Sequence, residues 1–152
     1  MQVEKTILVA DDDADDIFLL QRAFSKAHLS VNITYVRDGD EAIEFLQAAT
    51  IAPTSLPKLF FLDLKMPRVD GFEVLEWVRQ QPGLKRLPIL VLTSSDEPED
   101  INRAYDLGAN SYLVKPFGNE YLENIVDSLN AYWLNLNRDP DCSPAECGQF
   151  GL

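Results

Sequence analysis

The chain has 152 residues, 46% of them hydrophobic and 25% charged, which is the ordinary balance of one soluble globular domain with a sizeable core. Its formal net charge of −12 disfavours non-specific binding to nucleic acid or to an acidic membrane, and it makes hard cations and basic protein surfaces better partners. No apolar run is long enough for a transmembrane helix or for the core of a signal peptide, so we predict a cytoplasmic protein.

Short apolar runs alternate with amphipathic segments along the chain. Runs rich in aliphatic, β-branched and aromatic residues predict strands, and apolar residues at helical spacing predict helices. In chain order we expect a strand at 5–10, a helix from the acidic run to about residue 28, a strand at 31–36, a helix at 41–49, a loop at 50–57, a strand at 59–62, a helix at 72–80, a strand at 87–93, a helix up to residue 108, a strand at 111–114 and a helix at 120–136.

Five strand–helix pairs of this length are typical of an α/β fold. The runs at 59–62 and 87–93 are fully or almost fully apolar, as expected of central strands that are buried on both faces. Right-handed crossovers then favour a doubly wound, five-stranded parallel sheet with the order 2-1-3-4-5, the flavodoxin-like arrangement. No repeat or second domain is visible. We therefore assign residues 1–136 to this domain and residues 137–152 to a polar C-terminal tail.

Two local signals mark the boundaries of the fourth helix. Asp96, followed by Pro98 and Glu99, predicts an N-cap with a capping box. Gly108 predicts the end of the same helix, because glycine readily adopts the left-handed conformation of a C-terminal cap.

The last helix carries two apolar stripes. We expect the first stripe to cover the sheet and the second to remain as surplus apolar area, which favours a homodimer or a docked partner; packing against the preceding helix is the alternative. The first stripe is Leu122, Val126, Leu129, Trp133 and Leu136, and the second is Tyr121, Ile125 and Tyr132.

Polar side chains follow four of the predicted strands at their carboxyl ends, the edge where ligands bind in open α/β sheets. They are Asp11 and Asp12, then Asp63, then Thr93, and finally Lys115. In the order 2-1-3-4-5, Asp12 and Asp63 face each other across the switch point between the first and third strands. Carboxylates this close repel one another, which raises their pKa unless a cation joins them, and an oxygen-rich cluster suits Mg²⁺. A lysine and a threonine hydroxyl on the same carboxylate are what a phosphoryl group requires.

Other acidic residues near this edge have a simpler interpretation. An acidic run before a helix usually supplies a cap and favourable contacts with the helix dipole, and we expect no more of Asp13, Asp15 and Asp16. No glycine-rich phosphate loop is present, and no residues suggest a Ser-His-Asp triad. Cys142 and Cys147 lie in the tail without a neighbouring histidine or further cysteine, which indicates reduced thiols rather than a zinc site.

Four segments of the chain carry a family resemblance: ILVADDDADD, FLDLKMPRVDG, LTSS and YLVKPF. Together they resemble the receiver domain of two-component response regulators over residues 5–136. The resemblance implies that Asp63 accepts a phosphoryl group from a phosphohistidine of a sensor histidine kinase. It implies that Asp11 and Asp12 form the acidic pair that binds Mg²⁺ with Asp63, and that the backbone carbonyl of Lys65 completes the protein ligands. It further implies that Lys115 holds the phosphoryl group.

The resemblance also implies a switch. Thr93 and Tyr112 are the expected switch pair, in which Thr93 moves toward the phosphoryl group and Tyr112 rotates into the vacated space. This change would remodel the face built from the fourth helix, fifth strand and fifth helix, where Tyr112 joins the surplus stripe of the last helix as a candidate dimer contact. The bond between Lys115 and Pro116 is expected to be the cis peptide typical of receivers.

In this family the protein is a signalling switch that catalyses only its own phosphorylation and slow dephosphorylation, rather than a metabolic enzyme. We see no output domain after residue 136, so we expect the signal to leave through a protein surface or a further phosphotransfer. The segments NSYLVKPF and SLNAYWLNL also resemble stand-alone regulators that are paired with bacterial or cyanobacterial phytochrome kinases.

Three alternatives compete with a phosphorylatable receiver. A binding module of the same fold would not use phosphate, but the chain retains all five site residues. A phosphatase of the haloacid dehalogenase type would need a second acid two residues after the nucleophile, where this chain has Lys65. A flavodoxin is disfavoured because the acidic cluster would repel the cofactor phosphate.

Overall fold

Five parallel strands form one sheet in the order β2-β1-β3-β4-β5, as predicted. The computed structural model describes residues 5–52, 56–115, 118–138 and 140, and the statements below concern these residues. The strands are β1 (Lys5–Ala10), β2 (Val31–Val36), β3 (Leu59–Leu62), β4 (Ile89–Thr93) and β5 (Ser111–Val114). Four strands have the predicted bounds, and β4 begins two residues later than expected.

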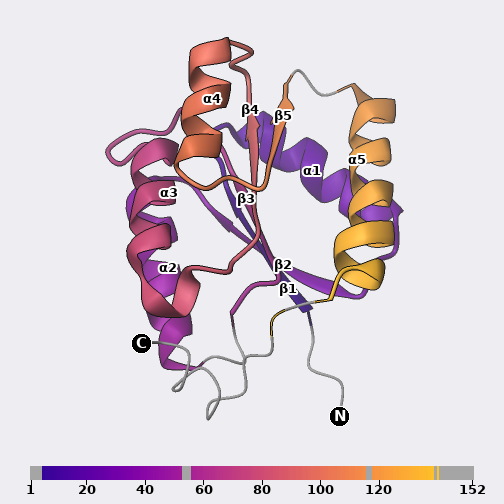
Figure 1. Ribbon diagram of the computed structural model, residues 1–152. Helices are drawn as coiled ribbons and strands as arrows, with labels where there is room; N and C mark the ends of the chain where they lie inside the picture. The colour runs from indigo at the N-terminus through magenta and orange to yellow at the C-terminus, as the bar shows by residue number, and fades with distance from the viewer. Residues whose placement is uncertain (1–4, 53–55, 116–117, 139, 141–152) are drawn as a thin grey trace.

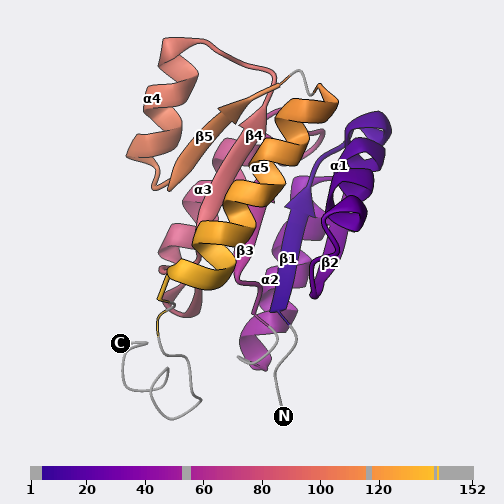
Figure 2. The ribbon, with the colours of Figure 1, turned by 90° about the vertical axis from the view of Figure 1, so that its right-hand side faces the viewer.

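Helices cover both faces of the sheet (Figure 1). They are α1 (Ala14–Lys26), α2 (Gly39–Ile51), α3 (Gly71–Gln80), α4 (Pro98–Asp106) and α5 (Asn119–Ala131), with a 3₁₀ turn η2 (Pro82–Leu84) and a π-helical turn η3 (Tyr132–Leu136). In Figure 1, α1 and α5 lie on one side of the sheet and α2 and α3 lie on the other, and Figure 2 shows α5 crossing in front of the strands. The fold is the doubly wound, flavodoxin-like arrangement that the sequence predicts.

Alternate residues of the central strands build two apolar cores. In β3, Phe60 and Leu62 join the core under α2, α3 and α4, whereas Leu59 and Phe61 join the core under α1 and α5. All four residues of β3 are at most 1% exposed. A strand that is buried on both faces needs a continuous apolar run, which explains the pattern at 59–62.

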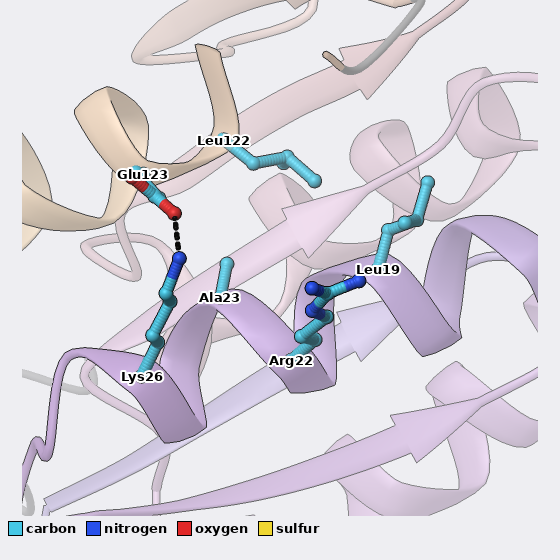
Figure 3. A pocket seen from close by; sticks show the side chains of 6 residues that line it. All are labelled: Leu19, Arg22, Ala23, Lys26, Leu122 and Glu123. Atoms are coloured by element: carbon cyan, nitrogen blue, oxygen red, sulfur yellow. Dashed lines mark hydrogen bonds and ion pairs between the residues drawn. The ribbon is translucent and has the colours of Figure 1, made fainter. Parts of the chain in front are cut away.

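Helices α1 and α5 pack side by side on one face of the sheet. Figure 3 shows Leu19 and Ala23 of α1 near Leu122 of α5, with an ion pair between Lys26 and Glu123 at one end. The Lys26 Nζ to Glu123 Oε1 distance is 2.7 Å, and the two side chains are 63% and 41% exposed. An exposed pair of this kind contributes little to stability, so apolar packing holds the two helices together.

Asp side chains cap the first turns of three helices: Asp13 caps α1, Asp38 caps α2 and Asp70 caps α3. The side chain of Asp38 accepts a hydrogen bond from the Glu41 N–H at 2.8 Å, and that of Asp70 accepts one from the Glu73 N–H at 2.9 Å. Because these caps satisfy backbone donors of the first turn, α2 begins at residue 39, two residues before the predicted start, and α3 begins at residue 71. The end of α2 lies at residue 51, inside the segment predicted as a loop.

The predicted capping box at Asp96 is wrong. Helix α4 has Glu97 as its N-cap, without a side-chain hydrogen bond. Instead, the Ser95 hydroxyl accepts a hydrogen bond from the Glu97 N–H at 3.3 Å and donates one to Asp100 at 2.6 Å. Ser95 therefore supplies the polar contacts that the sequence pattern assigns to Asp96. The predicted stop at Gly108 is confirmed, with a left-handed φ of 106°.

The prediction of one regular helix to residue 136 is also wrong. Helix α5 ends at Ala131, and the π turn follows, closed by a hydrogen bond from the Asn137 N–H to the Tyr132 carbonyl. A π turn has more residues per turn than an α-helix, so it rotates the later positions about the axis. Leu134 is therefore buried at 7% exposure, whereas Leu136, assigned to the core-facing stripe, is 74% exposed.

The two apolar stripes of α5 differ in part from the prediction. Leu122, Val126 and Leu129 are buried as expected. Ile125, predicted as surplus surface, is also buried at 7% exposure, because it packs in the core shared with α1. Tyr121 and Tyr132 are 38% and 51% exposed, so the surplus aromatic area consists of these two residues.

None of the helices in the described residues combines the length and the apolar character needed to cross a membrane.

Candidate functional site

The predicted site residues lie together at the carboxyl edge of the sheet because backbone hydrogen bonds continue beyond the strand ends. The Asp11 N–H donates to the Val36 carbonyl and the Asp63 N–H donates to the Ala10 carbonyl, both at 3.0 Å. The Lys115 N–H donates to the Thr93 carbonyl at 2.7 Å. Each functional side chain is therefore held on rigid backbone rather than on a free loop.

Three carboxylates form the acidic centre of the site. Asp11, Asp12 and Asp63 each offer an oxygen atom, and these oxygens lie within 4.8 Å of one another. Asp11 and Asp63 are buried, at 2% and 6% exposure, whereas Asp12 is exposed. A set of carboxylate oxygens with one open side fits a hard cation such as Mg²⁺, which keeps several of its waters.

Lys115 is the cation at the centre of the described residues of this site. Its Nζ lies 2.6 Å from Asp11 Oδ2, 2.7 Å from Asp16 Oδ2 and 3.2 Å from Asp63 Oδ2. The first and third contacts join residues that the sequence places at one edge. The second corrects the interpretation of Asp16 as only a helix-terminal charge, because its carboxylate reaches into the site. The spacing of residues along α1 does not reveal this contact, because the partner, Lys115, follows β5 and lies 99 residues later in the chain.

Burial and pairing shift the pKa of both partners. Burial raises the pKa of Asp11 to about 7, although the hydrogen bond from Lys115 opposes the shift. Burial alone would lower the pKa of Lys115, but its hydrogen bonds with Asp11 and Asp16 and the charge of Asp63 outweigh that effect and raise it. Lys115 is therefore an ammonium ion at neutral pH, as binding of a phosphoryl group requires.

Thr93 is fully buried at the end of β4, and its hydroxyl group is buried with it. Among the buried side-chain nitrogen and oxygen atoms of the described residues, Thr93 Oγ1 is the one without a hydrogen-bond partner. A buried hydroxyl without a partner costs free energy, so its retention points to a ligand oxygen that the hydroxyl can meet. Thr93 ends β4, the neighbour of β3 in the sheet, so its hydroxyl belongs to the same carboxyl edge as Asp63.

Tyr112 is half-buried on β5 and packs against the core under α4. Its hydroxyl donates a hydrogen bond to the Ser95 carbonyl at 2.9 Å. Burial raises the pKa of Tyr112, the hydrogen bond with Ser95 opposes this, and nearby carboxylates led by Asp100 add to it. Tyr112 therefore links β5 to the loop between β4 and α4, the connection that the predicted switch requires.

The loop after β3 is held tightly against the strand that carries Asp63. The Lys65 N–H donates to Asp63 Oδ1 at 3.2 Å, while a metal-binding role for the Lys65 carbonyl stays a prediction. The Gly71 N–H donates to the Leu64 carbonyl at 3.0 Å, and a Cβ atom at Gly71 would lie 2.3 Å from the Asp63 carbonyl oxygen. Glycine is thus required where α3 begins. Pro116, and with it the predicted cis peptide, lies outside the described residues, as do Cys142 and Cys147.

Comparison with known proteins gives consistent results. Residues 7–127 match the family described as the response regulator receiver domain. The chain is 38% identical over 134 residues to the probable methanogenesis regulatory protein FilR2 of Methanothrix harundinacea, covering 88% of this chain and 86% of that one. It is 36% identical over 131 residues to the response regulator Rcp1 of Synechocystis, covering 86% and 89% of the two chains.

Solved structures of two such relatives share the fold. The crystal structure of the phosphorylated cyanobacterial phytochrome response regulator RcpA has a TM-score of 0.81 and 36% identity, covering 91% of this chain and 99% of that one. The Mn²⁺-bound form of Rcp1 has a TM-score of 0.78 and 35% identity, covering 90% and 99%. Together with the sheet order and the carboxylate–lysine centre at its carboxyl edge, these matches establish that the chain belongs to the response regulator receiver domain family of two-component signalling proteins.

Proposed function

We propose that this protein is a response regulator that accepts a phosphoryl group on Asp63 from a sensor histidine kinase, with Mg²⁺ as the cofactor. The observation that carries the proposal is the convergence of three carboxylates, the Lys115 ammonium and the unpartnered Thr93 hydroxyl at one sheet edge. The similar proteins described as response regulators support it, and one of them was crystallised phosphorylated and another with Mn²⁺.

In the proposed reaction, a carboxylate oxygen of Asp63 attacks the phosphorus of a phosphohistidine. A P–O bond to Asp63 forms as the P–N bond breaks, and the histidine nitrogen keeps the electron pair. Lys115 Nζ donates a hydrogen bond to one phosphoryl oxygen, and the Thr93 hydroxyl donates to another. Asp11, Asp12, Asp63 and the Lys65 carbonyl would hold Mg²⁺, which would supply positive charge to offset the negative charge of the transferred group. The protein thereby catalyses its own phosphorylation and slow dephosphorylation rather than the turnover of a metabolite.

The proposed output is a change in the face formed by α4, β5 and α5. A phosphoryl group adds nearly two negative charges and strong hydrogen-bond acceptors, which draw the Thr93 hydroxyl. Tyr112 and its bond to the Ser95 carbonyl would transmit this change to the start of α4. We further propose a cytoplasmic location and a kinase of the phytochrome type, the latter because the similar structures include phytochrome-associated regulators.

We also propose that a second copy of the chain docks on this face. A groove of about 300 Å³ runs between the outer edge of β5 and α5, and Tyr121 and Tyr132 line it. Both tyrosines are exposed, and β5 is the last strand of the sheet, so among the described residues no further strand pairs with its outer edge. The groove is also lined by Leu90, Ser111, Leu113, Asn124, Ile125, Ser128, Leu129 and Trp133.

Intact-mass analysis after incubation with acetyl phosphate and Mg²⁺ tests the phosphorylation proposal. We expect the wild type to gain the mass of one phosphoryl group and Asp63→Asn to gain none. EDTA should prevent the gain, because the carboxylates then repel the donor. Asp15→Asn, which removes a charge from the exposed start of α1, serves as the matched control and should be labelled like the wild type.

Two results would contradict the proposal. Labelling of Asp63→Asn to the same extent as the wild type would place the acceptor elsewhere. A failure of both acetyl phosphate and a purified histidine kinase to label the wild type would favour a binding module of the same fold that does not use phosphate.

A further inference from the structure

Asp16 occupies the third position of α1, and its side chain does not cap the helix. The side chain of Asp13 is the cap, accepting hydrogen bonds from the backbone N–H groups of Asp15 at 2.9 Å and Asp16 at 3.3 Å. The Asp13 N–H in turn donates to Asp11 Oδ1 at 3.0 Å, which leaves no place for the reciprocal half of a capping box. The Asp16 carboxylate points to the end of β5 instead, 2.7 Å from Lys115 Nζ.

We infer that Asp16 is a positioning residue for Lys115: it holds the ammonium at the site while the other two carboxylates engage the cation and the phosphoryl group. This inference rests on the proposed phosphoryl transfer to Asp63.

The carboxylates around Lys115 divide into two groups. Asp11 and Asp63 belong to the cluster whose oxygens lie within 4.8 Å of one another, where a divalent cation would bind. Asp16 is outside that cluster. A cation on Asp11 and Asp63 competes with Lys115 for their oxygens, and phosphorylation removes the charge of Asp63, so Asp16 is the carboxylate that keeps its full charge for Lys115 throughout.

The number of donors agrees with this division. An ammonium has three N–H groups, and within the described part of the chain Lys115 Nζ forms ion pairs with the carboxylates of Asp11, Asp16 and Asp63. When one donor turns to the phosphoryl group, the bond to Asp16 can persist. The Lys115 and Asp16 side chains are 8% and 21% exposed, so solvent screens their attraction weakly. A fixed counter-ion of this kind restricts a long side chain that otherwise has many rotamers.

Charge alone predicts the opposite effect on the rate of phosphorylation. If Asp16 acted mainly by repelling the incoming phosphoryl group, its removal would speed phosphorylation. Positioning and repulsion therefore predict opposite signs, and one variant separates them.

The test compares Asp16→Ala with Asp15→Ala, which removes the same charge from the same turn of α1 but from an exposed side chain. The readout is the rate of Asp63 labelling by acetyl phosphate at saturating Mg²⁺, followed by intact mass. Loss of a positioning partner should slow labelling of Asp16→Ala about tenfold, while Asp15→Ala stays within about twofold of the wild type. Labelling of Asp16→Ala at or above the rate of Asp15→Ala would overturn the inference.

A double-mutant cycle shows whether Asp16 acts through Lys115. In a Lys115→Gln background, which is itself slow, the further change Asp16→Ala should alter the rate by less than about twofold. A tenfold loss in that background would mean that Asp16 acts on the cation or on the fold, and would equally overturn the inference.

The contact itself can be measured without phosphorylation. In metal-free protein, the ammonium hydrogens of Lys115 should exchange slowly enough with water to give a ¹H–¹⁵N NMR signal in the wild type and in Asp15→Ala, but not in Asp16→Ala. A failure of both acetyl phosphate and a purified histidine kinase to label the wild type would refute the proposed function, whereas an unchanged ammonium signal in Asp16→Ala would refute the positioning role alone.

Discussion

Thr93 places a hydroxyl group in a fully buried position where it has no hydrogen-bond partner among the described residues. Replacing Thr93 with valine removes the hydroxyl and keeps the shape. We expect Thr93→Val to raise the free energy of unfolding of the metal-free protein by about 1 kcal/mol, because the desolvation cost of the hydroxyl disappears.

Urea denaturation monitored by circular dichroism measures this change. Thr93→Ser, which keeps the hydroxyl and loses the methyl group, is the control and should lower the free energy of unfolding. A destabilised Thr93→Val protein would show that the hydroxyl has a partner in solution, and the argument for a ligand oxygen beside Thr93 would fail.

Asp11 makes stability depend on pH in the metal-free protein. Its pKa is raised by burial from 3.8 to about 7 in the folded state. Between these values the folded protein binds more protons than the unfolded chain, so the contribution of Asp11 to the free energy of unfolding falls as pH rises through this window. In EDTA, we expect the wild type to lose stability relative to Asp11→Asn between pH 3.8 and about 7.

Thermal or urea unfolding at several pH values measures the difference between the two proteins. Asp11→Asn is a suitable reference because it keeps the size of the side chain and cannot titrate. Parallel pH profiles would mean that Asp11 remains ionised in the folded protein down to its ordinary pKa.

At the scale of elements, the start of α3 is pressed against the strand that carries Asp63. A Cβ atom at Gly71 would lie 2.3 Å from the Asp63 carbonyl oxygen and 2.6 Å from Leu64 Cα, and these backbone atoms cannot move aside cheaply. We expect Gly71→Ala to lower the free energy of unfolding by about 2–3 kcal/mol, as overpacking does.

Gly83 provides the matched control for this substitution. A Cβ atom there would meet only the Thr50 methyl group, at an ordinary 3.7 Å. Gly83→Ala should change the free energy of unfolding by less than about 0.5 kcal/mol in the same urea experiment. Equal effects of the two substitutions would show that the loss comes from glycine in general rather than from the close approach to Asp63.

Helix α4 is tied to the rest of the fold at both of its ends. At its start, Ser95 bonds with Asp100 and with Tyr112. At its end, the Arg79 guanidinium of α3 donates to the Gly108 carbonyl at 2.7 Å and to Asn110 at 3.0 Å. The start of the helix is therefore bonded to Tyr112 of β5 through Ser95, and its end is anchored to α3.

At the scale of the whole molecule, the net charge of −12 opposes association of two copies. Apolar contact in the groove beside α5 favours association, and salt screens the repulsion. We expect self-association of the phosphorylated protein to strengthen with ionic strength. The double substitution Tyr121→Ser and Tyr132→Ser should raise the dissociation constant about tenfold or more, as the loss of aromatic contact residues does.

Sedimentation equilibrium at low and high ionic strength measures this constant. Phe18→Ser is the control, because Phe18 is 61% exposed but lies on α1, away from the groove. An equal loss of association in both variants would indicate non-specific contact between apolar side chains. Monomers under all conditions would contradict the proposed homodimer.

The sequence by itself determined the sheet, its order and the residues at its carboxyl edge. A strand that is buried on both faces must be apolar throughout, as at 59–62, and parallel strands bring their carboxyl ends to one edge. Asp11, Asp63, Thr93 and Lys115 could therefore be assigned to one site before any contact was known.

Only the tertiary structure decided which polar side chains bond to each other and which residues at the end of α5 are buried. Asp16 follows the pattern of a helix-terminal acid, but its partner Lys115 lies 99 residues away in the chain, and only the tertiary fold brings the start of α1 to the carboxyl end of β5. Ser95 displaces Asp96 at the start of α4 because its buried hydroxyl is already fixed by Asp100. The π turn after Ala131 places Leu134 in the core and leaves Leu136 exposed. The spacing of apolar residues in the sequence does not reveal this change in the number of residues per turn. Local patterns indicate most of the buried strand positions, whereas helix irregularities and choices among equivalent partners depend on contacts that are distant in the chain.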